Sequence, residues 1–189
     1  LARALIQNPG VLLLHEPLSA LDPIFHDGAK KLLKKIHQET GITMVMVSHN
    51  FQDVIFLADK GAVIHRGRIL QQGNILTIFD KPSSRFTADF VGMKNIHPIR
   101  IRGDLMQVEG GGLQIEPGAL PDVSHKHMGI RPEDIVFDFS GSGTWENQFQ
   151  GIVQSISNHG AFLDVRLKVG KNEFDAVWPR SYLKEYGLV

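Results

Sequence analysis

The sequence contains no cysteine, no long apolar run and no excess of charge. Without cysteine there is no disulfide framework and no thiolate to act as a nucleophile or metal ligand. No apolar run approaches the roughly 20 residues that a membrane-spanning helix requires, and we expect no signal peptide. The 20 basic residues balance the 20 acidic ones. We therefore expect no nucleic-acid partner, because nucleic-acid binding requires a basic face.

What remains is the composition of an ordinary globular protein. The 189 residues are 42% hydrophobic, which is enough for one or two domains with a buried core. The chain begins at Leu1 rather than at a methionine. We interpret this start as a fragment, or a processed form, of a longer protein.

The first half of the sequence alternates between apolar runs and helical patterns. Val11–Leu14 and Ile42–Val47 are continuous apolar runs, typical of strands that are covered on both faces of a parallel sheet. Between them Asp22 and Pro23 begin a helix, because aspartate is a favoured N-cap and proline fits the first turn. Gly41 ends this helix. The order strand, helix, strand, helix predicts an α/β fold with a parallel sheet.

Four lysines lie on the polar face of this predicted helix: Lys30, Lys31, Lys34 and Lys35. They would suit a polyanion, but a solvated helix face is the interpretation that we favour. In the next predicted helix, Asn50 and Asp53 have the spacing of a capping arrangement.

The pattern changes after residue 60. Arg66-Gly67 between two short apolar segments indicates a hairpin, and two short helices are expected near 75–79 and 85–91. From Ile96 onward the sequence predicts only short strands, which favour a small OB-like barrel. We accordingly expect one domain over residues 1–93 and a β-domain over residues 94–189. The expected strands of the β-domain are 99–102, 105–109, 113–115, 128–131, 150–157, 162–169 and 173–178.

Polar side chains follow both predicted strands of the first half. Glu16 comes after the first strand and His49 after the second. Ligands of open α/β sheets bind beyond the carboxyl ends of the strands. A carboxylate there can orient or deprotonate a water, and an imidazole can contact a phosphate. The alternative for Glu16 is an ordinary helix-capping or surface role.

The residues around these positions resemble the ATP-binding cassette (ABC) ATPases. The run LLLHEPLSALD at 12–22 resembles their Walker B strand and D-loop, and VSH at 47–49 followed by FQD resembles their switch-histidine segment. LARAL at 1–5 resembles the helix after their signature sequence, and the stretch from 58 to 73 resembles their following hairpin. These four segments occur in the family's order, and the resemblance implies that residues 1–93 are part of a P-loop NTPase domain.

The resemblance implies a role for each matching residue. Glu16 matches the catalytic glutamate that polarises the attacking water, and His49 matches the histidine that contacts the γ-phosphate. Ser19 to Asp22 match the loop that communicates across the ATP-bound dimer. ATP and Mg²⁺ are the implied cofactors of the complete subunit.

Two departures from the family pattern put activity in doubt. His15 stands where the family has an aspartate that helps to hold Mg²⁺, and a hard cation prefers oxygen ligands. His15 as a tolerated variant is the alternative. The phosphate loop G-x-x-x-x-G-K-[ST] does not occur in the sequence, and Gly110–Gly112 has no following helix to bind phosphate. We therefore expect half an ATP site, which alone neither binds nor hydrolyses ATP well.

The second half resembles the TOBE (transport-associated OB-like) domain of importer ATPases. The matching segments are GIRPEDI at 129–135, ENQFQGIV at 146–153 and RSYLKEYGL at 180–188. In the family a further strand follows the last segment, so we expect that this domain lacks its final strand.

The runs 23–37 and 78–96 look most like the molybdate or tungstate importer group. Arg180 and Ser181, at the start of a predicted helix, are a candidate anion site, with a simple helix cap as the favoured alternative. His125 and His127 would suit a metal, but two ligands without a third favour a loop pair.

Two functions follow from these observations. The first is the ATP-hydrolysing subunit of an oxyanion importer at the cytoplasmic face of the membrane. Its implied partners are a second ATPase subunit, a transmembrane permease and, indirectly, a solute-binding protein. The second is a non-catalytic regulatory, dimerising or oxyanion-sensing fragment. An ABC protein without a transporter is disfavoured, because TOBE domains mark importers.

Overall fold

The computed structural model divides the chain into two compact units, Leu1–Thr87 and Ala88–Val189. The structure describes residues 2–7, 9–117, 124, 126–138, 141, 143 and 145–185. The division falls within the short helix Arg85–Phe90, whereas the sequence predicts a boundary at 93–94. Within the described residues, no helix is long and apolar enough to cross a bilayer.

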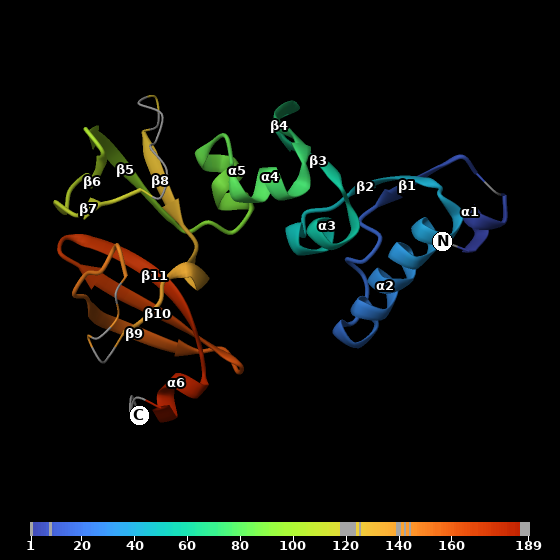
Figure 1. Cartoon of the computed structure of the whole chain (residues 1–189). Helices are drawn as coiled ribbons and strands as arrows, with labels where there is room; N and C mark the ends of the chain where they lie inside the picture. Colours follow the sequence, from blue (N-terminus) through green and yellow to red (C-terminus); the bar gives the residue numbers. More distant parts are fainter. Residues whose placement is uncertain are drawn as a thin grey trace. The chain divides into compact units, whose positions relative to one another are not determined.

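The first unit combines helices with two small sheets (Figure 1). Strands β1 and β2 form a parallel pair with the register Val11↔Thr43 to His15↔Val47. Strands β3 and β4 form an antiparallel hairpin. The elements are α1 (Ala2–Ile6), β1 (Val11–His15), α2 (Pro23–Thr40), β2 (Thr43–Val47), α3 (Phe51–Leu57), β3 (Lys60–His65), β4 (Arg68–Asn74), α4 (Ile75–Asp80) and α5 (Arg85–Phe90).

Helix α2 has the ends that the sequence predicts. Pro23 occupies the first turn, and Gly41 takes a left-handed φ of 65° while its N–H donates to the carbonyl of His37. Asp22 is at the N-cap position, but its side chain makes no capping hydrogen bond. The expectation that the Asp22 side chain caps the helix is therefore wrong. Its backbone carbonyl instead accepts from the N–H groups of Phe25 and His26.

The lysine face of α2 is only partly solvated. Lys30 lies near the carboxylate of Asp53, and Lys34 donates to the carbonyl of Phe56 at 2.8 Å. Both ammonium groups also lie over the ring of Phe56. The lysines nearest α3 thus fasten the two helices together, whereas Lys31 and Lys35 are exposed.

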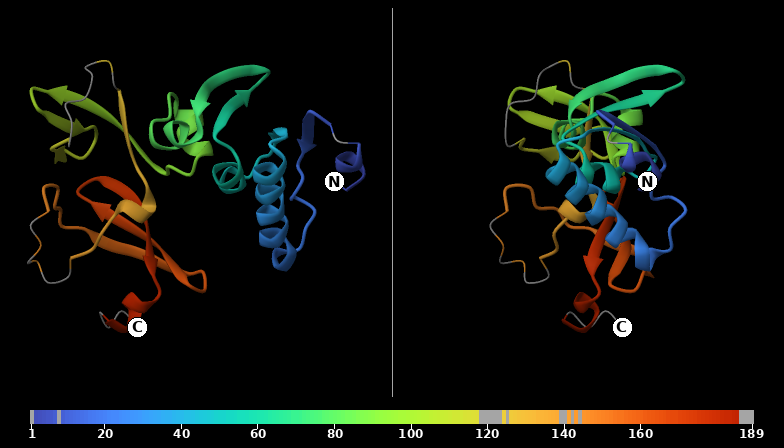
Figure 2. Two further views of the ribbon diagram at one scale, coloured as in Figure 1. Left: turned by 45° about the vertical axis from the view of Figure 1, so that its right-hand side comes forward. Right: turned by 90° about the vertical axis from the view of Figure 1, so that its right-hand side faces the viewer.

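The parallel pair β1–β2 is covered on one face only. Leu12 is buried, but the alternate side chains are exposed, and Leu13 reaches 74%. Val11 and Val47 are more than half exposed, and Val45 is half exposed. The prediction that both strands are buried on both faces is wrong for this chain. Helix α2 lies alongside the pair (Figures 1 and 2), and the described residues supply no element for its other face.

The hairpin β3–β4 turns at Arg66-Gly67, as predicted. Both residues have positive φ, 48° and 74°, which is the geometry of a type I′ turn. The helices that follow are α4, whose N-cap Asn74 accepts from the N–H groups of Leu76 and Thr77, and α5.

The second unit consists of two antiparallel sheets with a core between them. One sheet has the order β7-β6-β5-β8 and the other the order β11-β10-β9; Figure 1 labels these strands. The described pairings do not show the expected closure into a barrel. The elements are β5 (Asn95–Arg102), β6 (Leu105–Val108), β7 (Gln114–Ile115), β8 (His127–Ile130), a 3₁₀ turn (Pro132–Asp134), β9 (Ile152–Asn158), β10 (Phe162–Val169), β11 (Asn172–Pro179) and α6 (Ser181–Glu185).

Buried side chains from both sheets form one core. Trp178, Leu163 and Val108 are nearly inaccessible, and the ring of Phe137 meets Trp178 edge-on at 3.5 Å between centroids. Alternate residues of β10 and β11 point into this core, as expected for strands with one covered face.

The run Gly110–Gly112 has a structural explanation. Gly110 and Gly112 have positive φ values of 83° and 70°. A Cβ at Gly111 would lie 1.5 Å from Oδ1 of Asn172, whose amide donates to the carbonyl of Glu109. The glycines therefore form a turn against Asn172, which accounts for this run without a bound phosphate.

Candidate functional site

The side chains of Glu16 and His49 are in contact at the carboxyl ends of β1 and β2. Oε1 of Glu16 accepts from the backbone N–H of His49 at 3.0 Å and lies 2.8 Å from Nδ1 of its ring. The parallel register explains this proximity, because it sets His15 beside Val47 at the end of the pair. The Glu16 side chain is one quarter exposed and the His49 side chain is largely exposed.

The backbone at Glu16 bends sharply out of the strand. Glu16 has a φ of 47°, a left-handed value that is uncommon for residues other than glycine. Its N–H still donates to the carbonyl of Val47 at 2.9 Å, so the turn begins only after the last strand bond. This bend directs the carboxylate across the strand end toward His49.

The electrostatics of the pair fix the proton on Nδ1. The hydrogen bond from the His49 side chain is the main cause that holds the pKa of Glu16 below its ordinary value. Glu16 is thus an ionised carboxylate at neutral pH, and an ionised carboxylate only accepts hydrogen bonds. His49 Nδ1 therefore carries the proton of this hydrogen bond, and Nε2 takes no part in the contact with Glu16.

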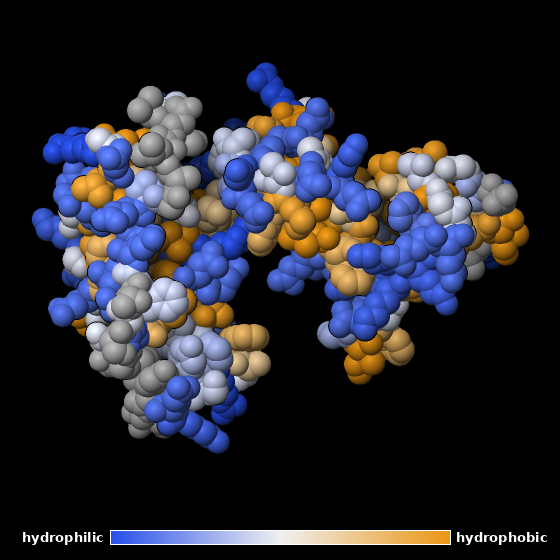
Figure 3. Space-filling model, in the orientation of Figure 1, coloured by the Kyte–Doolittle hydropathy of each residue, from blue (hydrophilic) through white to orange (hydrophobic). Residues whose placement is uncertain are grey.

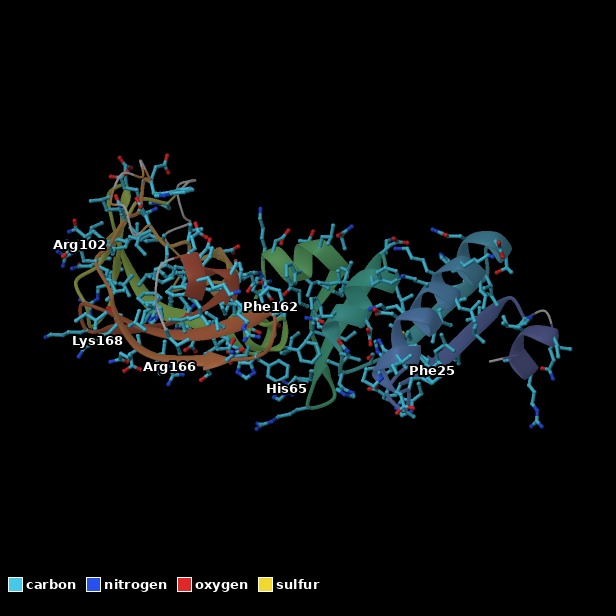
Figure 4. The ribbon with its side chains drawn as sticks, turned by 90° about the horizontal axis from the view of Figure 1, so that it is seen from below. Phe25, His65, Arg102, Phe162, Arg166 and Lys168 are labelled. Atoms are coloured by element: carbon cyan, nitrogen blue, oxygen red, sulfur yellow. The ribbon has the colours of Figure 1, made fainter. Side chains whose placement is uncertain are left out.

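The segment from Ser19 to Asp22 forms a turn directly after Glu16. Ser19 Oγ donates to the carbonyl of Glu16 at 3.0 Å, so this turn is tied to the strand end. Asp22 is exposed, as are the apolar residues Ile24 and Phe25 at the start of α2. Phe25 is 64% exposed and projects away from the helix (Figure 4), and apolar surface is visible at this end of α2 (Figure 3).

His15 ends strand β1 on its exposed face, next to Glu16 in the chain. The charge of His15 is the smallest of the causes that lower the pKa of Glu16. Across the part of the chain that the structure describes, no group of three or more His, Cys, Asp or Glu side chains is placed to hold a metal ion.

The second unit carries a polar cavity of about 310 Å³ on the outer face of the β9–β11 sheet. Arg166 Nε donates to Oδ1 of Asp175 at 3.0 Å, and this contact raises the pKa of Arg166. His159 lies 3.4 Å from Asp164. Arg166 projects from β10 together with Lys168 (Figure 4). The charged and hydroxyl side chains that line the cavity are Lys94, Ser155, Ser157, His159, Asp164, Arg166 and Asp175.

The candidate anion residues Arg180 and Ser181 lie where β11 passes into α6. The Arg180 N–H donates to the carbonyl of Ala161, its carbonyl accepts from Leu183, and Ser181 is exposed. Helix α6 has only five residues. Of the histidine pair, His127 begins β8 and is exposed, whereas His125 lies outside the described residues.

A buried polar contact near the site was not predicted. Asp53 is 3% exposed, and its carboxylate lies 3.0 Å from Nε2 of His26 on α2. Its backbone N–H donates to the Asn50 side chain, as the capping spacing predicts. The spacing of Asn50 and Asp53 does not predict the contact with His26, because His26 and Asp53 are 27 positions apart in the sequence.

The chain is similar to known proteins over most or all of its length. Residues 128–178 match the TOBE domain family. The chain is 37% identical over 171 residues to the sulfate/thiosulfate import ATP-binding protein CysA 2 of Chromobacterium violaceum, covering 89% of this chain and 46% of that protein. It is 35% identical over 191 residues to the molybdate/tungstate import ATP-binding protein WtpC of Pyrococcus horikoshii, covering 100% of this chain and 54% of that protein.

A third relative is the spermidine/putrescine import ATP-binding protein PotA of Roseobacter denitrificans, 39% identical over 82% of this chain and 45% of that protein. The chain thus spans about half the length of the curated relatives that it matches. Among solved structures, cbiO1 of Clostridium perfringens, titled part of the ABC transporter complex cbiONQ, covers 42% of this chain and 32% of its own at 35% identity, with a TM-score of 0.39.

Proposed function

Because the chain resembles about half of an ABC-importer ATP-binding subunit and carries a TOBE domain, we propose that it is part of such a subunit and contributes Glu16 and His49 to ATP hydrolysis. The observation that carries this proposal is the 2.8 Å contact between Glu16 and His49 at the ends of two paired parallel strands. That contact joins two motifs that resemble the Walker B and switch-histidine segments.

The geometry gives each side chain a distinct task. Both hydrogen bonds from His49 fall on Oε1 of Glu16, so Oε2 is the oxygen that addresses a water. Orientation or partial deprotonation of that water assists its attack on a phosphorus atom. Nε2 of His49 takes no part in the hydrogen bonds to Glu16, and it donates only when both ring nitrogens carry protons. Nε2 would then contact a terminal phosphate oxygen while Nδ1 stays bound to Glu16.

ATP supplies the phosphoanhydride bond that is broken, and this chain supplies only part of its site. A phosphate loop is missing from the sequence, so the backbone N–H groups that cradle phosphates must come from another segment. The apolar outer face of β1–β2 supports this division, because exposed apolar surface of this kind marks a contact site. We propose that the rest of the subunit covers this face.

His15 fits magnesium coordination poorly. Imidazole offers one nitrogen and no negative charge, whereas Mg²⁺ prefers oxygen ligands. We therefore assign no step to a metal held by His15. Should His15 prevent turnover, the alternative function is a non-catalytic regulatory, dimerising or oxyanion-sensing piece, which the missing phosphate loop also favours.

The solute and the partners follow from resemblance. The relatives named above are importer subunits for sulfate or thiosulfate, for molybdate or tungstate, and for spermidine or putrescine. We propose molybdate, tungstate or a related oxyanion, on the resemblance of the runs 23–37 and 78–96. A second ATPase subunit, a permease and a solute-binding protein would complete the importer, with this subunit at the cytoplasmic face of the membrane.

The test is a steady-state ATPase assay of the complete subunit, encoded with the sequence upstream of Leu1. Glu16→Gln keeps the size of the side chain but removes its charge, so we expect turnover to fall by about 10²–10⁴-fold. Glu39→Gln, an exposed glutamate of α2, is the matched control and should retain activity. Equal turnover in the two variants would refute the proposed role of Glu16.

A further inference from the structure

Asp53 is a buried carboxylate at the contact between α2 and α3. Burial of a carboxylate is costly unless polar or charged partners surround it. Its two oxygens have different partners on α2: Oδ2 lies 3.0 Å from Nε2 of His26, and Oδ1 lies 3.6 Å from Nζ of Lys30. His26 also lies 4.0 Å from the exposed Asp27. In the described contacts, these are the titratable groups that surround the carboxylate.

The His26–Asp53 contact joins the two segments that carry the candidate site. On α2, the backbone N–H of His26 donates to the carbonyl of Asp22 at 3.0 Å. On α3, the backbone N–H of Asp53 donates to Oδ1 of Asn50 at 3.3 Å, and Asn50 directly follows His49. The hydrogen bonds from His26 to Asp22 and from Asp53 to Asn50 join near neighbours in the sequence. His26 and Asp53, in contrast, are 27 residues apart.

The Glu16–His49 contact is a second link between the same two segments. These two residues are 33 positions apart, and Ser19 ties the turn that leads to α2 back to the carbonyl of Glu16. The segments 16–26 and 48–53 are thus connected at two separate places. Two connections restrict both the distance and the rotation of one segment relative to the other.

We propose that His26 and Asp53 are positioning residues for the Glu16–His49 pair. Their contact fixes the start of α3, and with it His49, relative to the strand end that bears Glu16. Any effect on turnover rests on the function proposed above, but the positioning itself is a property of this chain without nucleotide. The competing explanation is that the contact only fastens α2 to α3.

The experiment is nitrogen-15 NMR of the histidine side chains in the 189-residue chain at neutral pH. It identifies which ring nitrogen of His49 carries the proton. In the native sequence we expect the Nδ1–H form, because Glu16 accepts from that nitrogen. In His26→Gln and in Asp53→Asn we expect loss of the Nδ1–H signal. His26→Arg places a cationic donor beside the carboxylate and should restore it.

Two control variants separate positioning from general loosening. Lys35→Gln breaks the exposed Lys35–Glu39 pair on the same helix and should leave the His49 signal unchanged. Leu33→Ala removes a buried side chain of α2 and leaves the residues of the His26–Asp53 and Glu16–His49 contacts in place. It should lower the melting temperature and still preserve the Nδ1–H signal.

The outcomes decide between the two explanations. Preservation of the His49 signal in both His26→Gln and Asp53→Asn overturns the proposal, and so does an equal loss of that signal in Leu33→Ala. Failure of His26→Arg to restore the signal also counts against it. Inactivity of the complete subunit with the expected NMR results would refute the proposed function alone.

Discussion

The side-chain amide of Asn95 bonds both backbone polar groups of Asp175, so that a residue of one sheet of the second unit is paired with a strand of the other. Nδ2 of Asn95 donates to the carbonyl of Asp175 at 2.8 Å, and the N–H of Asp175 donates to Oδ1 of Asn95 at 2.7 Å. Asn95 is buried and also donates to the carbonyl of Ile130. The amide thus connects β5, β8 and β11.

Asn95→Ala is expected to destabilise the second unit. It leaves the partly buried backbone N–H and carbonyl of Asp175 without their partner, and each such loss costs up to about 1–3 kcal/mol. We expect the free energy of unfolding to fall by roughly 2–4 kcal/mol. Denaturant titration followed by Trp178 fluorescence, which reports the core of this unit, measures the change. Asn158→Ala, at an exposed turn, should cost less than about 1 kcal/mol.

His97 should make the second unit sensitive to acid. Burial lowers the pKa of His97 below its ordinary value of 6.5. The unfolded state then binds more protons in the window just below pH 6.5, so stability is full above this pH and falls as the pH drops. His97→Gln should flatten this part of the pH profile in denaturant titrations. The exposed His159→Gln should keep the native profile, and an unchanged profile in His97→Gln would contradict the prediction.

Gly111→Ala and Gly28→Ala should change stability in opposite directions. A Cβ at Gly111 would collide with Asn172, so we expect a loss of about 1–3 kcal/mol. A Cβ at Gly28 meets nothing within 4 Å, and alanine favours the interior of α2 by about 1 kcal/mol over glycine. Thermal unfolding followed by circular dichroism compares the two, and a neutral Gly111→Ala would show that Asn172 can move away.

His15→Asp should increase the magnesium-dependent turnover of the complete subunit. Aspartate offers a negative charge and oxygen lone pairs to a hard cation, whereas neutral imidazole offers one nitrogen. We expect a higher maximal rate and a lower Mg²⁺ requirement in an ATPase titration. His37→Asp, at the far end of α2, is the control for an added carboxylate. Identical Mg²⁺ dependence in His15→Asp and the native subunit would make His15 a tolerated substitution.

The isolated chain should show no stabilisation by ATP. A ligand that binds only the folded state raises the melting temperature by mass action, and this chain lacks the phosphate loop that supplies most phosphate contacts. Thermal unfolding with and without Mg-ATP is the measurement. A saturable rise in melting temperature would show that the chain holds a nucleotide site of its own.

The sequence by itself determined the features that depend on neighbouring residues. Pro23 and Gly41 set the ends of α2, and Arg66-Gly67 set the hairpin turn, because these residues restrict or release backbone angles locally. The motif at 12–22 likewise indicates Glu16 through its immediate neighbours in the chain. Chain order alone also suggested that Glu16 and His49 share a strand edge, since parallel strands align their carboxyl ends.

Only the tertiary structure decided the features that depend on distant residues. The continuous apolar runs predicted strands with both faces covered, but coverage depends on which other elements are present, and one face of β1–β2 is bare. His26 is 27 positions from Asp53, and Asp175 is 80 positions from Asn95, so no local sequence pattern predicts these contacts. Burial turns such polar pairs into requirements of the fold, because an unpaired polar group away from water is costly.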